Sequence, residues 1–137
     1  MNEKIKILVS DDNQDFARTL VSYLSKDEDL EVVGIARDGQ DAYNKIVETK
    51  PDIALLDIIM PHLDGLGVLE KLNTADLSKK PMCIILSAVG QDKITRKAIE
   101  LGGTILHSKT IWYKYISKEN KRFKILSTNK QQDKCNK

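Results

Sequence analysis

Three short apolar runs in this sequence each end at a polar side chain that could bind a charged ligand. Residues 5–9 lead to Ser10, Asp11 and Asp12, residues 53–56 lead to Asp57, and residues 82–86 lead to Ser87. The carboxyl ends of neighbouring strands in an open parallel sheet lie along one edge, and that edge is where ligands bind. The sequence therefore predicts one pocket that contains all three carboxylates and a hydroxyl group.

Amphipathic segments separate the apolar runs. Residues 14–26, for example, carry Phe16, Leu20 and Leu24 at helical spacing. The expected strands are 4–10, 30–36, 53–57, 82–87 and a short one at 104–108, and the expected helices are 14–26, a segment between Gly39 and Pro51, 65–73 and 91–101. Strands that alternate with helices of this length predict an α/β fold with a parallel sheet between helices.

The size and composition of the chain exclude several classes of protein. A chain of 137 residues corresponds to about one domain. No apolar run approaches the roughly 20 residues that cross a bilayer, and the first strand begins too early for a signal peptide, so we expect a cytoplasmic protein that does not interact with membranes. Cys83 and Cys135 have neither disulfide nor metal-ligand spacing.

Charge is divided unevenly along the chain. Residues 1–103 hold 13 Lys and Arg against 18 Asp and Glu, whereas residues 104–137 hold 9 against 2. A basic tail of this kind is typical of proteins that bind nucleic acid or an acidic surface. A change of reading frame near Gly103 is a competing explanation.

Carboxylates crowded at one edge repel each other unless a cation lies among them. Because the cluster contains no His or Cys, the cation that it predicts is Mg²⁺. With its charge balanced, Asp57 would stay ionised and could attack phosphorus, while Ser87 would donate a hydrogen bond to a transferred oxygen. The alternative is that the strand-end aspartates only cap helices, as Asp12 would for the helix at 14–26.

The motifs that surround these residues resemble a known family. Ser10-Asp11-Asp12, the segment 55–65 and Leu86-Ser87-Ala88 resemble the receiver domain of two-component response regulators over residues 4–103. The segments 56–66 and 87–92 resemble, more narrowly, the stage 0 sporulation protein A group of endospore-forming Firmicutes. The resemblance implies a flavodoxin-like (βα)₅ fold with a five-stranded parallel sheet.

The resemblance also implies a role for each site residue. Asp57 would accept the phosphoryl group, Asp12 would bind Mg²⁺ directly, Asp11 would bind it through water, and the backbone carbonyl of Ile59 would complete the protein's ligands. Ser87 would be the hydroxyl that turns toward the new phosphate. In this family His62 belongs to the loop after the phosphorylated strand, which favours an exposed packing residue over a phosphate carrier.

Partners follow from the same resemblance. The phosphodonor would be a phosphotransferase or a histidine kinase of a phosphorelay, and phosphorylation would promote a homodimer. Related regulators of transcription in sporulation continue into a DNA-binding effector domain, which these residues do not contain. We therefore expect no direct DNA binding by this chain.

The pattern of the family breaks at the fifth strand. Lys109 stands at the expected distance from Leu101, but the family's Pro-Phe after this lysine is replaced by Thr110-Ile111. Allowed codons for residues 105–113, read one nucleotide later, encode Tyr-Tyr-Ile-Leu-Lys-Pro-Phe-Gly. We infer a frame change near Gly103, which gives a receiver domain at 1–109 and an atypical basic tail at 110–137 that is out of frame and truncated.

The frame change has a physical consequence. The tail replaces the family's helix five, which covers part of one face of the sheet. We expect that face to expose apolar side chains and the chain to be marginally stable.

Two other classes of function compete with a phosphoacceptor. Phosphatases of the haloacid dehalogenase type also use a strand-end aspartate, but they need a second one two residues later, where this chain has Ile59. The sequence thus disfavours an enzyme. A phosphorylation-independent interaction module, or a truncated fragment without function, stays open because the tail could prevent switching.

Overall fold

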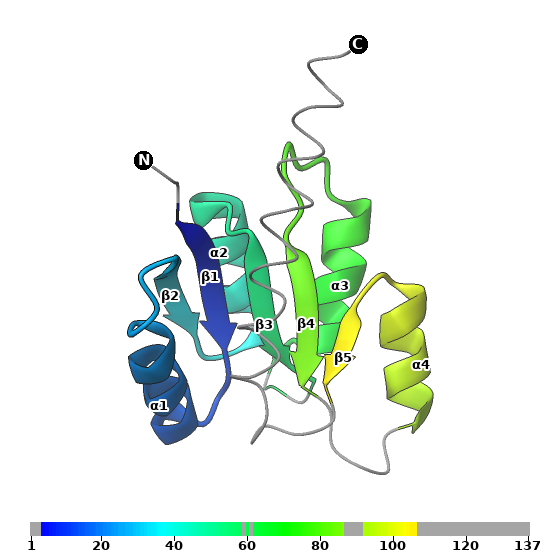
Figure 1. Cartoon of the computed structure of the whole chain (residues 1–137). Helices are drawn as coiled ribbons and strands as arrows, with labels where there is room; N and C mark the ends of the chain where they lie inside the picture. The colour runs from blue at the N-terminus through cyan, green and yellow to red at the C-terminus, as the bar shows by residue number, and fades with distance from the viewer. Residues whose placement is uncertain (1–3, 59, 61, 87–91, 107–137) are drawn as a thin grey trace.

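The structure of the chain, a computed structural model, describes residues 4–58, 60, 62–86 and 92–106. Five strands and four helices alternate along these residues: β1 (Ile5–Ser10), α1 (Gln14–Leu24), β2 (Leu30–Ala36), α2 (Gly39–Thr49), β3 (Ile53–Asp57), α3 (Gly65–Thr74), β4 (Met82–Leu86), α4 (Asp92–Glu100) and β5 (Thr104–Leu106). The strands form one parallel sheet in the order β2-β1-β3-β4-β5 (Figure 1). This is the flavodoxin-like arrangement that the family resemblance implied.

The sheet has an apolar core on each face because successive strand residues point in opposite directions. On one face, Ile7 and Val9 of β1 pack with Leu20 of α1. On the other face, Leu8 packs with residues of α2 and α3, including Ile46 and Val68. Figure 1 shows α1 in front of the sheet and α2 and α3 behind it. The two faces are called the α1 face and the α3 face below.

Side chains cap three of the helices at their N-termini. Asn13 accepts a hydrogen bond from the backbone N–H of Phe16, and Asp38 and Asp64 do the same for residues 41 and 67. Each cap satisfies a backbone donor that the helix itself leaves unpaired. The caps fix where α1, α2 and α3 begin, and all three helices begin near the edge of the sheet at which the strands end.

The expected and observed element boundaries agree to within about two residues, as is usual for helix ends. α1 ends at Leu24 rather than at residue 26. The predicted fifth strand is present from Thr104 to Leu106, and the rest of it lies outside the described residues. No helix in the described part of the chain combines the length and the apolar character that a membrane span requires.

The expectation of an exposed apolar face was wrong for the side chains that the structure describes. On the α1 face of β4, Ile84 is 0% exposed and Leu86 is 4% exposed. These residues lie two strands away from β1 in the sheet.

Candidate functional site

The structure brings Asp11, Asp12 and Asp57 together at one edge of the sheet. Ser10 and Leu56 are register partners in the parallel pair of β1 and β3, so the next residues, Asp11 and Asp57, leave the sheet side by side. One carboxylate oxygen from each of the three aspartates lies within 4.8 Å of the others. β1 and β3 flank the point where the strand order reverses, which is where ligands bind in open α/β sheets.

The three carboxylates differ in their exposure. Asp11 is 1% exposed and Asp57 is 9% exposed, whereas Asp12 is exposed to solvent. The backbone N–H of Asn13 donates to Oδ1 of Asp11 at 2.9 Å, which orients that side chain. Two negative charges held close together and away from water are unfavourable without a compensating cation. The arrangement is therefore suited to a bound cation, with Asp12 on the solvent side.

The donor set of the cluster fits Mg²⁺. All three side chains offer only oxygen, which is the ligand that this hard cation requires. Ligands on opposite sides of an octahedral Mg²⁺ lie about 4.2 Å apart, since each Mg–O distance is about 2.1 Å. A separation of up to 4.8 Å can be bridged if one carboxylate binds through water or moves slightly inward. Oxygen chemistry and spacing thus agree with a magnesium site.

The alternative role for Asp12, as the cap of α1, was wrong. The residue that caps α1 is Asn13, whose side chain accepts the hydrogen bond from the N–H of Phe16 at 3.1 Å. Its backbone also bonds Asp11, so Asn13 links the cluster to the helix. Asp12 therefore stays on the solvent-exposed side of the cluster, where the predicted metal site requires it.

The backbone after Asp57 is held closely by α3 and β4. The N–H of Ile58 donates to the carbonyl of Leu86 at 3.1 Å, so the pairing of β3 with β4 continues past Asp57. The N–H of Gly65 donates to the carbonyl of Ile58 at 3.2 Å. A Cβ atom on Gly65 would lie 2.8 Å from the carbonyl oxygen of Asp57, a distance that real Cβ atoms almost never show. Gly65 thus allows α3 to begin directly against the Asp57 backbone.

Three predicted site residues lie outside the described part of the chain. These are Ile59, whose carbonyl was expected to bind the metal, Ser87 and Lys109. Their roles stay predictions. Ser87 follows Leu86, which is the register partner of Asp57 in the pair of β3 and β4.

His62 lies beside the site rather than among the three clustered carboxylates. It is exposed, its φ angle of 67° is left-handed, and it lines a shallow hollow with Leu63 and the first turns of α2. This position agrees with an exposed loop residue.

The sequence reasoning missed two features near the cluster. The hydroxyl of Ser10 is buried and has no hydrogen-bond partner among the described residues. The backbone at Gly39 touches the carbonyl of Leu63 in the loop after β3. Neither feature has a signal in the sequence, since both depend on what the tertiary fold places next to these residues.

Comparison with known proteins agrees with the fold. Residues 7–127 match the family model of the response regulator receiver domain. A signal receiver domain of NarL from Mycobacterium tuberculosis is 31% identical, with a TM-score of 0.74, and the match covers 88% of this chain and 98% of that one.

Two further structures are similar over nearly their whole lengths. The N-terminal domain of an uncharacterized protein from Wolinella succinogenes is 26% identical with a TM-score of 0.78, covering 93% of this chain and 98% of that one. A signal receiver domain from Bermanella marisrubri is 28% identical with a TM-score of 0.73, covering 85% and 98%. The family match spans most of the chain and includes the three aspartates, and the chain therefore belongs to the response regulator receiver domain family.

Proposed function

We propose that this chain is a phosphoacceptor of a two-component system or phosphorelay and that Asp57 receives the phosphoryl group. The observation that carries the proposal is the gathering of Asp11, Asp12 and Asp57 at the carboxyl ends of β1 and β3, in a chain that belongs to the receiver family. Of the three, Asp57 is the one that ends a strand buried along its whole length.

The proposed reaction transfers a phosphoryl group from the donor to a carboxylate oxygen of Asp57. A carboxylate oxygen of Asp57 attacks phosphorus, and a new P–O bond forms to give a mixed carboxylic-phosphoric anhydride. The bond between phosphorus and the donor breaks, and its electron pair leaves with the donor group. With phosphohistidine as the donor, the imidazole nitrogen departs, and with acetyl phosphate, acetate departs.

Residues of this chain would hold the metal that the reaction needs. Asp11, Asp12 and Asp57 supply carboxylate oxygens, and we expect the carbonyl of Ile59 to join them. Bound Mg²⁺ would neutralise the charge on the phosphoryl oxygens during transfer. The N–H of Asn13 donates a hydrogen bond to Asp11, so the Asp11 carboxylate is already oriented before a ligand binds. We propose Ser87 and Lys109 as the contacts of the transferred phosphate.

Labelling by a small phosphodonor tests the proposal. Incubation with acetyl phosphate and Mg²⁺ should add one phosphoryl group to the intact chain by mass spectrometry, and chelation of the metal should prevent it. Asp57→Asn should abolish labelling because the amide is a poor nucleophile. Asp76→Asn is the matched control, because Asp76 is exposed and lies outside the cluster, in the connection between α3 and β4. Labelling that persists in Asp57→Asn would contradict the assignment.

Receiver domains act by accepting a phosphoryl group from histidine kinases or phosphotransferases and are generally not enzymes. We infer the same for this chain, with a homodimer as the product of phosphorylation and no direct DNA binding. Binding of a kinase or phosphotransferase that is unchanged by Mg²⁺ and phosphodonor would instead indicate an interaction module that works without phosphorylation. A cytoplasmic location stays a prediction.

The sporulation role rests on the resemblance of segments 56–66 and 87–92 to the stage 0 sporulation protein A group. We propose that role together with a frame change near Gly103. The receiver family match continues past Lys109 to residue 127, so it includes part of the tail that the frame change treats as foreign. Sequencing the gene through codon 104 tests the idea, because codons after that point that cannot encode the Lys-Pro-Phe motif in the shifted frame would contradict it.

A further inference from the structure

Asn13 stands between the carboxylate cluster and the first turn of α1, and it contacts both. Its backbone N–H donates to Oδ1 of Asp11 at 2.9 Å, and its side-chain oxygen accepts from the N–H of Phe16 at 3.1 Å. Its carbonyl accepts from the N–H of Ala17 at 3.0 Å, which is the first hydrogen bond inside the helix. One residue therefore holds a predicted metal ligand through its N–H and the start of a helix through its two oxygens.

The contact with Asp11 and the cap of α1 depend on one backbone conformation. With φ −82° and ψ 102°, Asn13 is extended, as a helix-capping residue is. The side chain and the N–H of a residue are attached to neighbouring atoms, so a bond that fixes the side chain against the helix also restricts the direction of the N–H. The cap of α1 thus limits how far the donor to Asp11 can turn away.

A substitution at position 13 changes mainly this cap. Asn13 is exposed, so its side chain contributes little to the core. The donor to Asp11 is a backbone N–H, which every residue except proline provides. Loss of the side-chain oxygen therefore leaves the donor in place but gives it more freedom.

We propose that Asn13 is a positioning residue for the metal. Its cap on α1 holds the Asp11 carboxylate in the orientation that binds Mg²⁺, and bound Mg²⁺ in turn stabilises the first turn of α1. The inference rests on the proposed function, because it takes the cluster to be a magnesium site. Groups that orient a metal ligand from outside the ligand set commonly change metal affinity by about 10–100-fold. The effect is reciprocal, since two coupled equilibria shift each other by the same factor.

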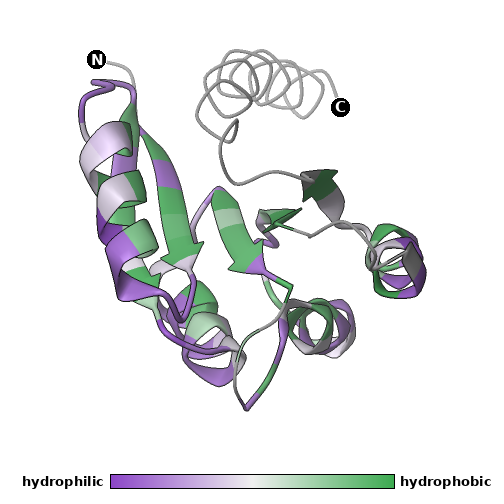
Figure 2. Ribbon diagram, turned by 90° about the horizontal axis from the view of Figure 1, so that it is seen from below, coloured by the Kyte–Doolittle hydropathy of each residue, from purple (hydrophilic) through white to green (hydrophobic). Residues whose placement is uncertain are grey.

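α2 provides a comparison within the same molecule. Asp38 caps α2 through its side chain, which accepts from the N–H of Asp41 at 2.8 Å, and its carbonyl accepts from the N–H of Ala42 at 2.9 Å. Asp38 is not one of the three clustered aspartates. Figure 2, which views the molecule from the edge at which the strands end, shows α1 on one side of the sheet and α2 on the other. Ala17 and Ala42 are both buried and are each the fourth residue after a cap, so their N–H groups can be compared directly.

Amide hydrogen exchange of the full chain, followed by NMR with and without Mg²⁺, tests the coupling. Saturating Mg²⁺ should slow exchange of the Ala17 N–H at least about threefold more than that of the Ala42 N–H, because only the first helix is joined to the cluster through its cap. General stabilisation of the fold would slow both groups alike. An equal effect on the two N–H groups would overturn the coupling.

Magnesium affinity of two neutral variants tests the role of the cap. Asn13→Ser keeps a capping oxygen, whereas Asn13→Ala removes it. By calorimetry, Asn13→Ala should bind Mg²⁺ at least about threefold more weakly than the unsubstituted protein, and Asn13→Ser should stay within about twofold of it. Should Asn13→Ala fail to fold, Asn13→Gly takes its place, since glycine is tolerated at a cap but leaves the backbone free. Unchanged affinity in the folded variant without a cap would overturn the proposal.

Asp38→Asn and Asp38→Ala are the matched control. Both remove the same charge, but only the second removes the cap of α2. Their magnesium affinities should agree within about twofold. A difference as large as that between Asn13→Ser and Asn13→Ala would show that any lost cap loosens the site, and the specific role of Asn13 would be wrong.

Failure of this inference can be told apart from failure of the proposed function. If the unsubstituted chain binds Mg²⁺ and is labelled on Asp57, but Asn13→Ala binds Mg²⁺ equally well, only the positioning role is wrong. If calorimetry shows no binding of Mg²⁺ to the unsubstituted chain, the magnesium site and the positioning role are wrong together.

Discussion

Gly39 and Leu63 are in backbone contact: a Cβ atom on Gly39 would lie 1.8 Å from the carbonyl oxygen of Leu63. Gly39 begins α2, and Leu63 belongs to the loop that leads from Asp57 to α3. The absence of a side chain at Gly39 therefore determines how closely α2 approaches the loop beside the candidate phosphorylation site.

Gly39→Ala should destabilise the fold because the clash is with backbone, which cannot move aside as a flexible side chain can. We expect a loss of about 1–3 kcal/mol in the free energy of unfolding, as for other overpacked sites, measured by urea denaturation. Gly34→Ala is the control, because its Cβ would meet Leu8 and Lys45 at an ordinary 3.5 Å. Equal stability of Gly39→Ala and the unsubstituted protein would show that the contact is looser than described.

Ser10→Ala should stabilise the protein. The Ser10 hydroxyl is buried without a hydrogen-bond partner among the described residues, and such a group costs about 1–3 kcal/mol of desolvation. The methyl group of alanine has no such cost, so the urea midpoint should rise with an unchanged slope. Ser78→Ala, at an exposed position between α3 and β4, should have little effect. A loss of stability in Ser10→Ala would mean that the hydroxyl has a partner.

Cys83 should make stability fall at alkaline pH. Burial raises the pKa of its thiol from 9.0 to about 12. Because the folded-state pKa is the higher one, the unfolded chain releases this proton first, and stability is lost as the pH rises above about 9 toward 12, by about 1.4 kcal/mol per pH unit. The loss should be smaller in Cys83→Ala, compared by urea denaturation at pH values on both sides of 9. Identical pH profiles for the two proteins would contradict the raised pKa.

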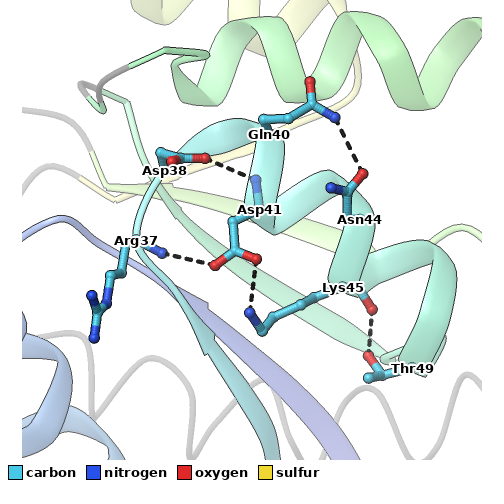
Figure 3. A network of polar contacts seen from close by, with 7 residues as sticks. All are labelled: Arg37, Asp38, Gln40, Asp41, Asn44, Lys45 and Thr49. Carbon is cyan, nitrogen blue, oxygen red and sulfur yellow. Dashed lines mark hydrogen bonds and ion pairs between the residues drawn. The ribbon is translucent and has the colours of Figure 1, made fainter.

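Asp41 should contribute stability at neutral pH and lose that contribution in acid. The hydrogen bond from Lys45 is the main cause that lowers the pKa of this carboxyl below 3.8, and the N–H of Arg37 also donates to it (Figure 3). Because the folded-state pKa is the lower one, the contribution is present above pH 3.8 and disappears as the pH falls through the folded value.

Asp41→Asn therefore lowers stability at pH 7, by less than about 1 kcal/mol because solvent screens this surface pair. The difference from the unsubstituted protein should shrink in acid, as followed by thermal unfolding across the acid range. Asp76→Asn, exposed in the connection between α3 and β4, serves as the control. A difference that does not depend on pH would mean that Asp41 acts by packing alone.

Asp12→Asn should weaken magnesium binding at least about tenfold, since the affinity of such sites follows the number of charged ligands. Mg²⁺ that binds only the folded chain raises its stability, by about 2.7 kcal/mol at 100 times the dissociation constant. Thermal unfolding at increasing Mg²⁺ should show this rise in the unsubstituted protein and in Asp15→Asn, an exposed aspartate of α1. An equal rise in Asp12→Asn would remove Asp12 from the ligand set.

The order and type of the elements could be predicted from the sequence because hydrophobic spacing reflects burial directly. β3 and β4 are continuous apolar runs, and the structure buries their side chains almost throughout, as expected for strands inside a parallel sheet. The meeting of Asp11, Asp12 and Asp57 was also predictable, since parallel strands in one sheet end at the same edge.

The exact cap of a helix and the contacts between distant segments could not be predicted in this way. That Asn13 rather than Asp12 caps α1 depends on a difference of one residue in where the helix begins. The close approach of Gly39 to Leu63 and the unpaired hydroxyl of Ser10 depend on the packing of neighbouring elements.

By itself, then, the sequence determined the order of strands and helices and the edge at which the acidic residues gather, because periodicity and strand direction are local properties of the chain. The tertiary structure alone decided which atoms meet across elements, because burial and close contact depend on residues that are far apart in the sequence and become neighbours only when the sheet and helices pack.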